Sequence, residues 1–191
     1  MKPPRAQLIG IGSILGKVPV GYTGFVWGTG RMRPSAPANI GRAKVLALRG
    51  PLTGEADLYA DPGLLVGRFA PKVEKRHKLG VIPHYIERLP HEGHHIDIQS
   101  GIENVIRAAA QCERIITSSL HALILADSLG IPNKWIFEEK VIGNGYKFRD
   151  YAASFGETIE PDVWRLAPQE LVAEKQEALI RVLRDAGLAS V

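Results

Sequence analysis

The residues with the clearest capacity for chemistry lie in the stretch 115–132, where two isoleucines lead through hydroxyl side chains into a pattern that predicts an amphipathic helix with one histidine. Ser118 and Ser119 are favoured helix N-caps, and His121 falls in the first predicted turn. The first N–H groups of a helix lack intrahelical partners and lie at the positive end of its dipole. We therefore expect an anion-binding corner that uses both serines, the backbone N–H of Leu120 and the imidazole of His121. The alternative for His121 is a histidine that is hydrogen-bonded to a loop.

Two further basic side chains follow predicted strands. Arg49 ends an apolar strand just before Gly50-Pro51, and His84 follows the strand that ends at Pro83. Ligands of open parallel sheets collect at the carboxyl ends of the strands, so Arg49 is a candidate clamp for a carboxylate or phosphate, and His84 is a candidate ligand contact. The alternatives are an ion pair between Arg49 and a carboxylate of the following predicted helix (Glu55 or Asp57), and structural hydrogen bonding by His84.

Lys147 and Arg149 belong to the segment Lys-Phe-Arg-Asp-Tyr near the end of the predicted sheet. They add positive charge to the candidate site, because an anionic ligand is attracted by every cation near it. The alternative is that they bridge two domains through Asp150.

Several other patterns are weaker than they look. The segment His91-Glu92-Gly93-His94-His95 lacks the helical His-Glu-x-x-His spacing, so we expect a polar loop and no metal site. The glycine pairs at 10 and 12 and at 28 and 30 lack the full dinucleotide fingerprint, which argues against nicotinamide binding. Cys112, the single cysteine, excludes an internal disulfide and is expected to serve packing.

The composition narrows the class of protein. The 191 residues are 45% hydrophobic and carry a net charge of +4, which suits anionic partners. Aromatic residues make up 7% and do not alternate with Lys and Arg, so we expect no nucleic-acid partner. The basic residues between Arg68 and Lys78 are expected to form a solvated loop. No apolar run reaches the roughly 20 residues that span a bilayer, and the cysteine usage favours a reducing compartment, so we expect a cytoplasmic protein.

Short apolar strands alternate with helical patterns, which predicts the α/β class with a parallel sheet. The predicted strands are Gln7–Ile11, Thr23–Gly28, Ala43–Leu48, Lys78–Ile82, His95–Ile98, Arg114–Ile116 and Asn133–Phe137. The predicted helices are Pro51–Asp57, Ile102–Gln111, Ser119–Leu129, Lys147–Phe155 and Pro168–Ala186.

The first predicted strand begins almost at the start of the chain, as if it entered the middle of a sheet. A buried parallel strand needs neighbours and covering helices. We therefore expect that a preceding segment is absent, or that another device such as a partner subunit in a homo-oligomer covers the edge.

Several segments, taken together, resemble the polysaccharide pyruvyl transferase family. They follow one another from about residue 8 to 156 and are Gly10-Ile11-Gly12-Ser13-Ile14-Leu15, Trp27-Gly28-Thr29-Gly30, Leu48-Arg49-Gly50-Pro51-Leu52-Thr53, Asp61-Pro62-Gly63-Leu64-Leu65, Gly80-Val81-Ile82-Pro83-His84-Tyr85, Thr117-Ser118-Ser119-Leu120-His121-Ala122, Ala126-Asp127-Ser128-Leu129-Gly130-Ile131-Pro132 and Lys147-Phe148-Arg149-Asp150-Tyr151.

The resemblance implies a Rossmann-like, glycosyltransferase-B-like (GT-B-like) architecture, with a partial N-terminal half at residues 1–75 and a donor-binding half with a terminal helix at 76–191. It implies transfer of pyruvate from phosphoenolpyruvate, without a cofactor, to a sugar hydroxyl pair as a ketal. His121 and Arg49 would be catalytic. Ser118, Ser119, Leu120, His84, Lys147 and Arg149 would bind substrate.

The sequence departs from the family pattern at two places. Relatives usually begin with an Asn-Phe-Gly-Asp-like motif that has no counterpart here, so we expect a truncated N-terminal half. Many relatives also carry Arg where this chain has Ser119, and a hydroxyl replaces neither the charge nor the reach of a guanidinium. We expect another cation to compensate, or weaker donor binding.

Three functions remain open from the sequence. The first is pyruvyl transfer to a sugar or lipid-linked oligosaccharide of a cell-surface polysaccharide, in the cytoplasm or at the inner face of the membrane through peripheral association. The second is a GT-B-type glycosyltransferase with a nucleotide-sugar donor. The third is a non-catalytic remnant, which the short N-terminus and Ser119 favour.

Overall fold

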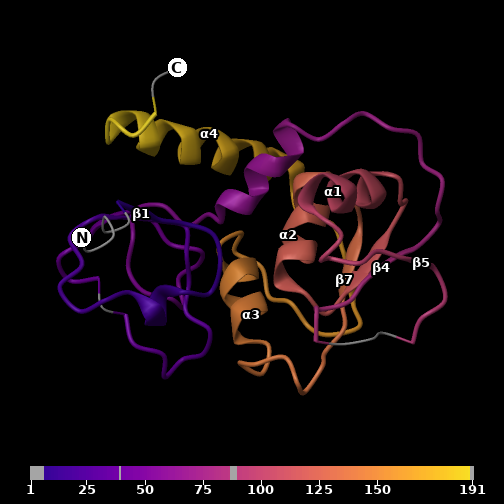
Figure 1. Ribbon diagram of the computed structural model, residues 1–191, viewed down its shortest axis with the longest axis horizontal. Coiled ribbons are helices and arrows are strands. Elements are labelled where there is room, and N and C mark those ends of the chain that lie inside the picture. Colours follow the sequence, from indigo (N-terminus) through magenta and orange to yellow (C-terminus); the bar gives the residue numbers. More distant parts are fainter. Residues whose placement is uncertain (1–6, 39, 87–89, 190–191) are drawn as a thin grey trace.

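The computed structural model describes residues 7–38, 40–86 and 90–189, and within them the chain forms two sheets of mainly parallel strands with flanking helices. The predicted α/β class and the Rossmann-like parallel pairing are therefore confirmed. Figure 1 shows the first sheet with its loops on one side, the second sheet on the other, and α3 between them.

Both sheets are built from short strands. The first contains β1 (Leu8–Ile9), β2 (Phe25–Trp27) and β3 (Lys44–Ala47) in that order, all parallel. The second has the order β5-β4-β6-β7-β8, in which β8 alone is antiparallel; its strands are β4 (Gly80–Ile82), β5 (His94–His95), β6 (Ile115–Thr117), β7 (Asn133–Trp135) and β8 (Trp164–Arg165).

Helices cover the sheets and connect them. The α-helices are α1 (Ile102–Ala110), α2 (Leu120–Ser128), α3 (Tyr146–Ala153) and α4 (Gln169–Asp185), and the 3₁₀ helices are η1 (Leu15–Lys17) and η2 (Pro62–Arg68). The helix η2 packs against both α2 and α4.

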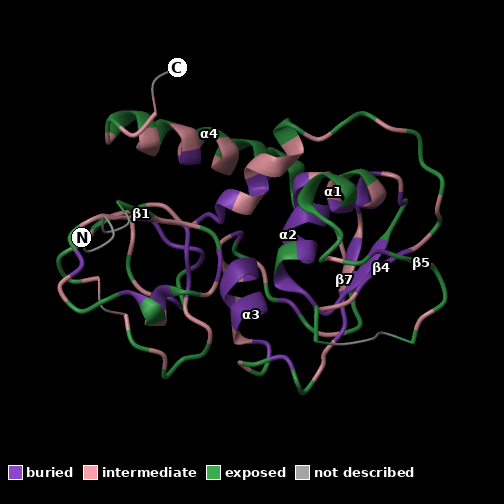
Figure 2. Cartoon of the chain, in the orientation of Figure 1, coloured by how far each residue is buried: buried purple, intermediate pink, exposed green. Residues whose placement is uncertain are grey.

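We call the parts of the molecule built around the first and the second sheet its first and second halves, and helix α2 lies at the centre of the second half. The prediction of an amphipathic helix is wrong here, because apolar side chains surround most of α2 and only His121 is exposed. Every residue of α2 except His121 is buried, and Figure 2 shows buried residues gathered in α2, α3 and the neighbouring strands. Its small side chains Ala122 and Ala126 pack with Ile82 and Ile115 of the sheet. The burial of this helix fixes the position of its first turn.

Helix α4 follows the second sheet but returns to the first (Figure 1). The fully buried Leu179 packs with Ala47 and Ala60, and its carbonyl accepts a hydrogen bond from Trp27 Nε1 at 3.2 Å. Gln176 Nε2 donates to Leu64 O on η2 at 2.7 Å. The long amphipathic helix α4 thus holds the two halves together along the top of Figure 1.

The predicted elements agree with the structure except in a few segments. The four other predicted helices are confirmed within about two residues, but the predicted helix Pro51–Asp57 is wrong, since this segment forms turns. Gly50 is pressed against Asp150, and Thr53 is hydrogen-bonded to the same residue, so a contact distant in sequence overrides the local pattern. Three elements were not predicted: the 3₁₀ helices η1 and η2, and the short edge strand β8.

No helix among the described residues has the length and apolar character that crossing a membrane requires.

Candidate functional site

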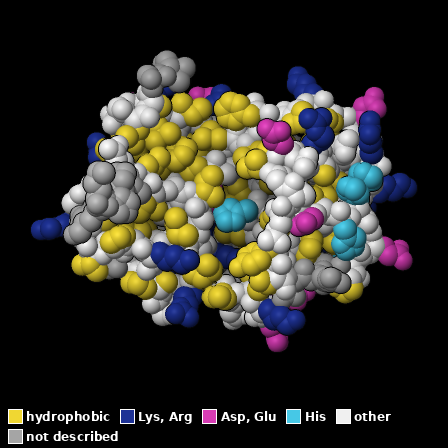
Figure 3. Space-filling view, viewed as in Figure 1, with side chains coloured by type: hydrophobic (Ala, Val, Ile, Leu, Met, Phe, Trp, Pro, Cys, Tyr) yellow, Lys and Arg dark blue, Asp and Glu magenta, His cyan; other side chains and the backbone are white. Residues whose placement is uncertain are grey.

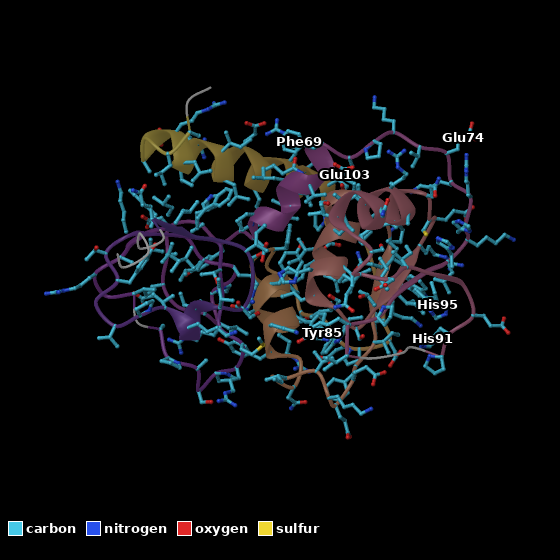
Figure 4. All side chains as sticks on the ribbon, viewed as in Figure 1. Phe69, Glu74, Tyr85, His91, His95 and Glu103 are labelled. Atoms are coloured by element: carbon cyan, nitrogen blue, oxygen red, sulfur yellow. The ribbon has the colours of Figure 1, made fainter. Side chains whose placement is uncertain are left out.

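A cavity of about 350 Å³ lies between the two halves. Its first-half wall contains Ser13, which follows β1, and Met32. The second half contributes the remaining lining residues, which are His84, Tyr85, Ile98, Gln99, Ser119, Leu120, His121 and Lys147. Figure 4 labels Tyr85 close to α3, and Figure 3 shows a hollow near the centre of this face, with histidine and basic side chains around it. None of these lining residues carries a carboxylate, so the cavity suits an anion.

The first turn of α2 forms one wall of the cavity. Ser119 occupies the N-cap position, but its side chain makes no capping hydrogen bond. The first bond into the helix runs from Leu123 N to Ser119 O at 3.1 Å, so the N–H groups of residues 120–122 precede the intrahelical ladder. Such N–H groups at the N-terminus of a helix can donate hydrogen bonds to a bound anion. The predicted anion-binding corner therefore has the required backbone arrangement.

His121 remains accessible from the cavity, although the rest of α2 is buried. Partial removal of water from its ring, together with the positive charges of Lys147, Arg49 and His84, lowers the pKa of His121 to about 4. The free protein thus holds a neutral imidazole at pH 7. A bound anion would stabilise the imidazolium and raise this pKa.

Lys147, the second residue of α3, supplies the ammonium group of the cavity. The side chain is buried, and burial followed by the positive charge of Arg49 lowers the pKa of Lys147 to about 8. The group is therefore mostly protonated at pH 7, yet close enough to its pKa to exchange a proton.

Ser118 and His84 are linked to each other. The backbone N–H of His84 donates to Ser118 Oγ at 2.9 Å, and Ser118 is buried and does not line the cavity. The hydroxyl of Ser118 therefore fixes the loop that carries His84. The ring of His84 stacks at a tilt on Tyr85, with 4.5 Å between the ring centroids.

Arg49 lies directly behind the cavity wall. It is completely buried, and its guanidinium pairs with Asp150 of α3 at 2.8 Å, so the sequence alternative of a pair with Glu55 or Asp57 is wrong. Its remaining donors bind Ser13 Oγ at 2.6 Å and the carbonyl of Arg31 at 2.7 Å. Arg49 was predicted to clamp a ligand directly, but it does not line the cavity beside His121 and reaches it through Ser13.

Two glycines make room for this arrangement. A Cβ on Gly30 would lie 2.3 Å from Arg49 Cζ, and a Cβ on Gly50 would lie 1.7 Å from the carbonyl oxygen of Asp150. No side chain fits at either position. Gly30 and Gly50 therefore serve the buried ion pair, because the backbone must pass close to it.

Arg149 is not among the residues that line the cavity. Its guanidinium stacks 5.5 Å from the ring centroid of Trp135, donates to Asn144 O at 2.9 Å and lies 4.0 Å from Glu160. The structure therefore brings Ser119, Leu120, His84, His121 and Lys147 together at one cavity, with Ser118 and Arg49 behind them, and leaves Arg149 outside.

Sequence reasoning did not select Ser13, Met32, Tyr85, Ile98 or Gln99. A signal for Ser13 was present, because it follows the first predicted strand, and the strand-end rule that selected Arg49 applies to it equally. The other four residues carry no strong chemical signature.

The histidine-rich segment lies elsewhere. His91 and His95 are labelled in Figure 4 at the edge of the second sheet, away from Tyr85, and His94 stacks on His77 with 3.8 Å between ring centroids. No group of three or more potential metal ligands occurs in the described part of the chain. Cys112 is buried and packs in the core with Ile82 and Ile115, as predicted.

A known protein family matches this chain. The polysaccharide pyruvyl transferase family model matches residues 40–136, which is just over half of the chain. This range includes Arg49 after β3, His84 after β4 and the first turn of α2. The chain belongs to the polysaccharide pyruvyl transferase family. The predicted family assignment is therefore confirmed.

Two curated relatives extend the comparison. The succinoglycan biosynthesis protein ExoV of Rhizobium meliloti (strain 1021) is 26% identical over 206 aligned positions, covering 97% of this chain and 63% of that protein. The uncharacterized protein L143 of Acanthamoeba polyphaga mimivirus is 32% identical over 121 residues, covering 55% of this chain and 42% of that protein. The chain thus spans less than two thirds of the length of both relatives.

Proposed function

We propose that this chain transfers pyruvate from phosphoenolpyruvate to two hydroxyls of a sugar, forming a cyclic ketal during polysaccharide biosynthesis. The observation that carries the proposal is the cavity itself. Two imidazoles, one ammonium and a helix N-terminus face a space of about 350 Å³ whose lining holds no carboxylate. Phosphoenolpyruvate carries a phosphate and a carboxylate, and such a lining favours both groups.

The chemistry needs a proton donor and charge stabilisation. A proton adds to the methylene carbon of the enol, and the neighbouring carbon becomes electrophilic. One sugar hydroxyl forms a bond to that carbon and loses its proton, and phosphate leaves with the electrons of its C–O bond. The second hydroxyl then closes the ring and releases its proton.

His121 is our candidate for the proton donor or for the imidazole that binds the donor substrate. In the donor role, the imidazole first gains a proton when the polyanion binds, since its pKa is about 4 in the free protein. Lys147 offers a protonated group at pH 7 and stabilises the charge of the departing phosphate. The N–H of Leu120 binds an anionic oxygen, while Ser119 and His84 contact the substrates from neighbouring walls.

The two sheets would correspond to the two halves of a GT-B-like architecture, with the second half holding the donor substrate. The acceptor would be a sugar or a lipid-linked oligosaccharide, and the chain would act in the cytoplasm or at the inner face of the membrane. The family assignment and the relative named for succinoglycan biosynthesis support a polysaccharide precursor as acceptor.

Titration calorimetry with phosphoenolpyruvate tests the proposal directly. We expect saturable binding at pH 7, followed by phosphate release and a new ketal signal in NMR spectra when acceptor sugars are added. Binding of a uridine-nucleotide sugar without affinity for phosphoenolpyruvate would select the glycosyltransferase alternative. A folded chain that binds neither donor would indicate a non-catalytic protein.

A further inference from the structure

Ser13 is the hydrogen-bonding side chain that the first half places in the cavity. It is half-buried, it follows β1, and it shares the cavity with His121 and Lys147 of the second half. Its Oγ lies 2.6 Å from Nη1 of Arg49. This short distance is typical of a hydrogen bond from a charged donor.

The direction of this hydrogen bond follows from the chemistry of the two groups. A guanidinium donates and never accepts, so Ser13 Oγ accepts from Arg49 and keeps its own O–H proton for another partner. In the described residues, the Ser13 hydroxyl donates to no protein group. The hydroxyl proton is therefore available to a ligand in the cavity.

The orientation of Arg49 is fixed from behind. Nε and Nη2 of Arg49 both approach Asp150 Oδ2 at 2.8 Å, and Nη2 also donates to Arg31 O. Gly30 allows the backbone to lie directly against the guanidinium, since a Cβ at this position would lie 2.3 Å from Arg49 Cζ. Arg49 is completely buried, so Ser13 is the cavity-lining side chain through which its guanidinium can make a hydrogen-bonded link to a ligand.

We propose that the hydroxyl of Ser13 donates a hydrogen bond to an anionic oxygen of the bound donor, and that Arg49 is a positioning residue that polarises and orients this hydroxyl. The inference rests on the proposed function, because it assigns a second anion contact to the same cavity. It places this contact on the first half, opposite the N-terminus of α2, so that the two anionic groups of phosphoenolpyruvate are held from both sides.

Calorimetry with three anions tests the assignment. Phosphoenolpyruvate presents both anionic groups, inorganic phosphate presents one of them, and pyruvate presents the other. We expect Ser13→Ala to weaken phosphoenolpyruvate binding about tenfold or more, as the loss of a hydrogen bond to a charged group does. Ser13→Thr retains the hydroxyl and should bind within about threefold of the parent. The probe whose affinity falls with Ser13→Ala identifies whether Ser13 contacts phosphate or carboxylate.

Ser35→Ala is the matched control, because Ser35 is an exposed serine of the same half that does not line the cavity. It should leave all three affinities unchanged. Equal binding of phosphoenolpyruvate by Ser13→Ala and the parent would overturn the proposal. Thermal unfolding of each variant confirms that the comparison is made between folded proteins.

Arg49→Lys tests the relay. If Arg49 acts through Ser13, Arg49→Lys weakens anion binding in the parent but has little further effect in the Ser13→Ala background. Additive losses in the double variant would overturn the positioning role. The comparison of Ser13→Thr with Ser13→Ala tests the hydroxyl contact independently of Arg49, since a purely structural role of position 13 would not need a hydroxyl.

The test separates this inference from the proposed function. If the parent binds phosphate in a Ser13-dependent manner but has no affinity for phosphoenolpyruvate, the proposed donor is wrong while the anion contact stands. Absence of binding of all three anions to the parent would overturn both.

Discussion

Arg49 and Asp150 form a completely buried ion pair across 101 residues of sequence, and the pair joins the first half of the chain to α3. Asp150 Oδ1 accepts from Thr53 N at 2.9 Å and Oδ2 accepts from Thr53 Oγ1 at 2.7 Å, so the carboxylate is fully engaged. Arg149 and Lys147 precede Asp150 on the same helix, but only Lys147 lines the cavity. The ion pair therefore fixes the position of α3 against the first half, and with it the position of Lys147 in the cavity.

Breaking this pair should be costly to stability. Asp150→Asn leaves the buried guanidinium of Arg49 without a counter-charge, and we expect the free energy of unfolding to fall by about 3–5 kcal/mol. Urea denaturation at pH 7 measures the change. Glu177→Gln is the control, because the Arg68–Glu177 pair is exposed, with side chains 36% and 63% accessible, and should contribute less than about 1 kcal/mol. A loss of similar size in both variants would contradict a structural role for the buried pair.

Lys147 should make donor binding depend on pH. The protonated ammonium attracts the anion, and the pKa of Lys147 is about 8, so the affinity for phosphoenolpyruvate should fall as the pH rises through 8. Lys147→Met should weaken binding about tenfold at pH 7 and remove this pH dependence. Lys147→Arg keeps its charge, and its affinity should stay level between pH 7 and about 9.5.

Calorimetry across this pH range provides the measurement, and Lys140→Met is the control at an exposed lysine of the same half. An unchanged pH profile in Lys147→Met would show that another group titrates.

His121 should affect transfer more than folding. Its ring is accessible from the cavity, so His121→Ala removes a functional group without opening a space in the core. If His121 donates the proton, kcat should fall about 100-fold or more, whereas a role in donor binding alone would raise KM and leave kcat unchanged. Steady-state phosphate release distinguishes these outcomes. His95→Ala, at an exposed histidine on the sheet edge, should behave as the parent does.

The helices and parallel strands were predictable because their signals are local. Apolar periodicity located α1 and α4 within about two residues. The strand-end rule selected His84, and the first turn of the helix that follows the hydroxyls selected His121; the structure places both histidines at one cavity. The hydroxyl residues before α2 correctly indicated where the helix begins, because Ser119 occupies the N-cap position, although its side chain makes no capping hydrogen bond.

The errors arose where distant residues decide the structure. Residues 51–57 carry a proline followed by helix-compatible residues, yet Gly50 and Thr53 are held by Asp150 about 100 positions later. The same distant contact buries Arg49, which pattern analysis placed at the ligand. A signal for η2 was present in Asp61-Pro62, since Asp61 caps the helix and proline occupies its first position.

Asp61 should make stability fall with rising pH. The side chain is completely buried, its Oδ1 accepts from Gly63 N at 2.8 Å, and its Oδ2 has no hydrogen-bond partner within the described residues. Burial raises the pKa of Asp61 from 3.8 to about 6. The folded state therefore holds the proton more tightly than the unfolded state, and the resulting stability is fully present below pH 3.8 and is lost as the pH rises through 6.

Asp61→Asn stays neutral and can keep the cap, so its stability relative to the parent should improve by up to about 3 kcal/mol between pH 4 and 7. Urea denaturation at both pH values, with the exposed Asp57→Asn as control, checks this, and a relative stability that stays constant or declines over this interval would contradict the raised pKa.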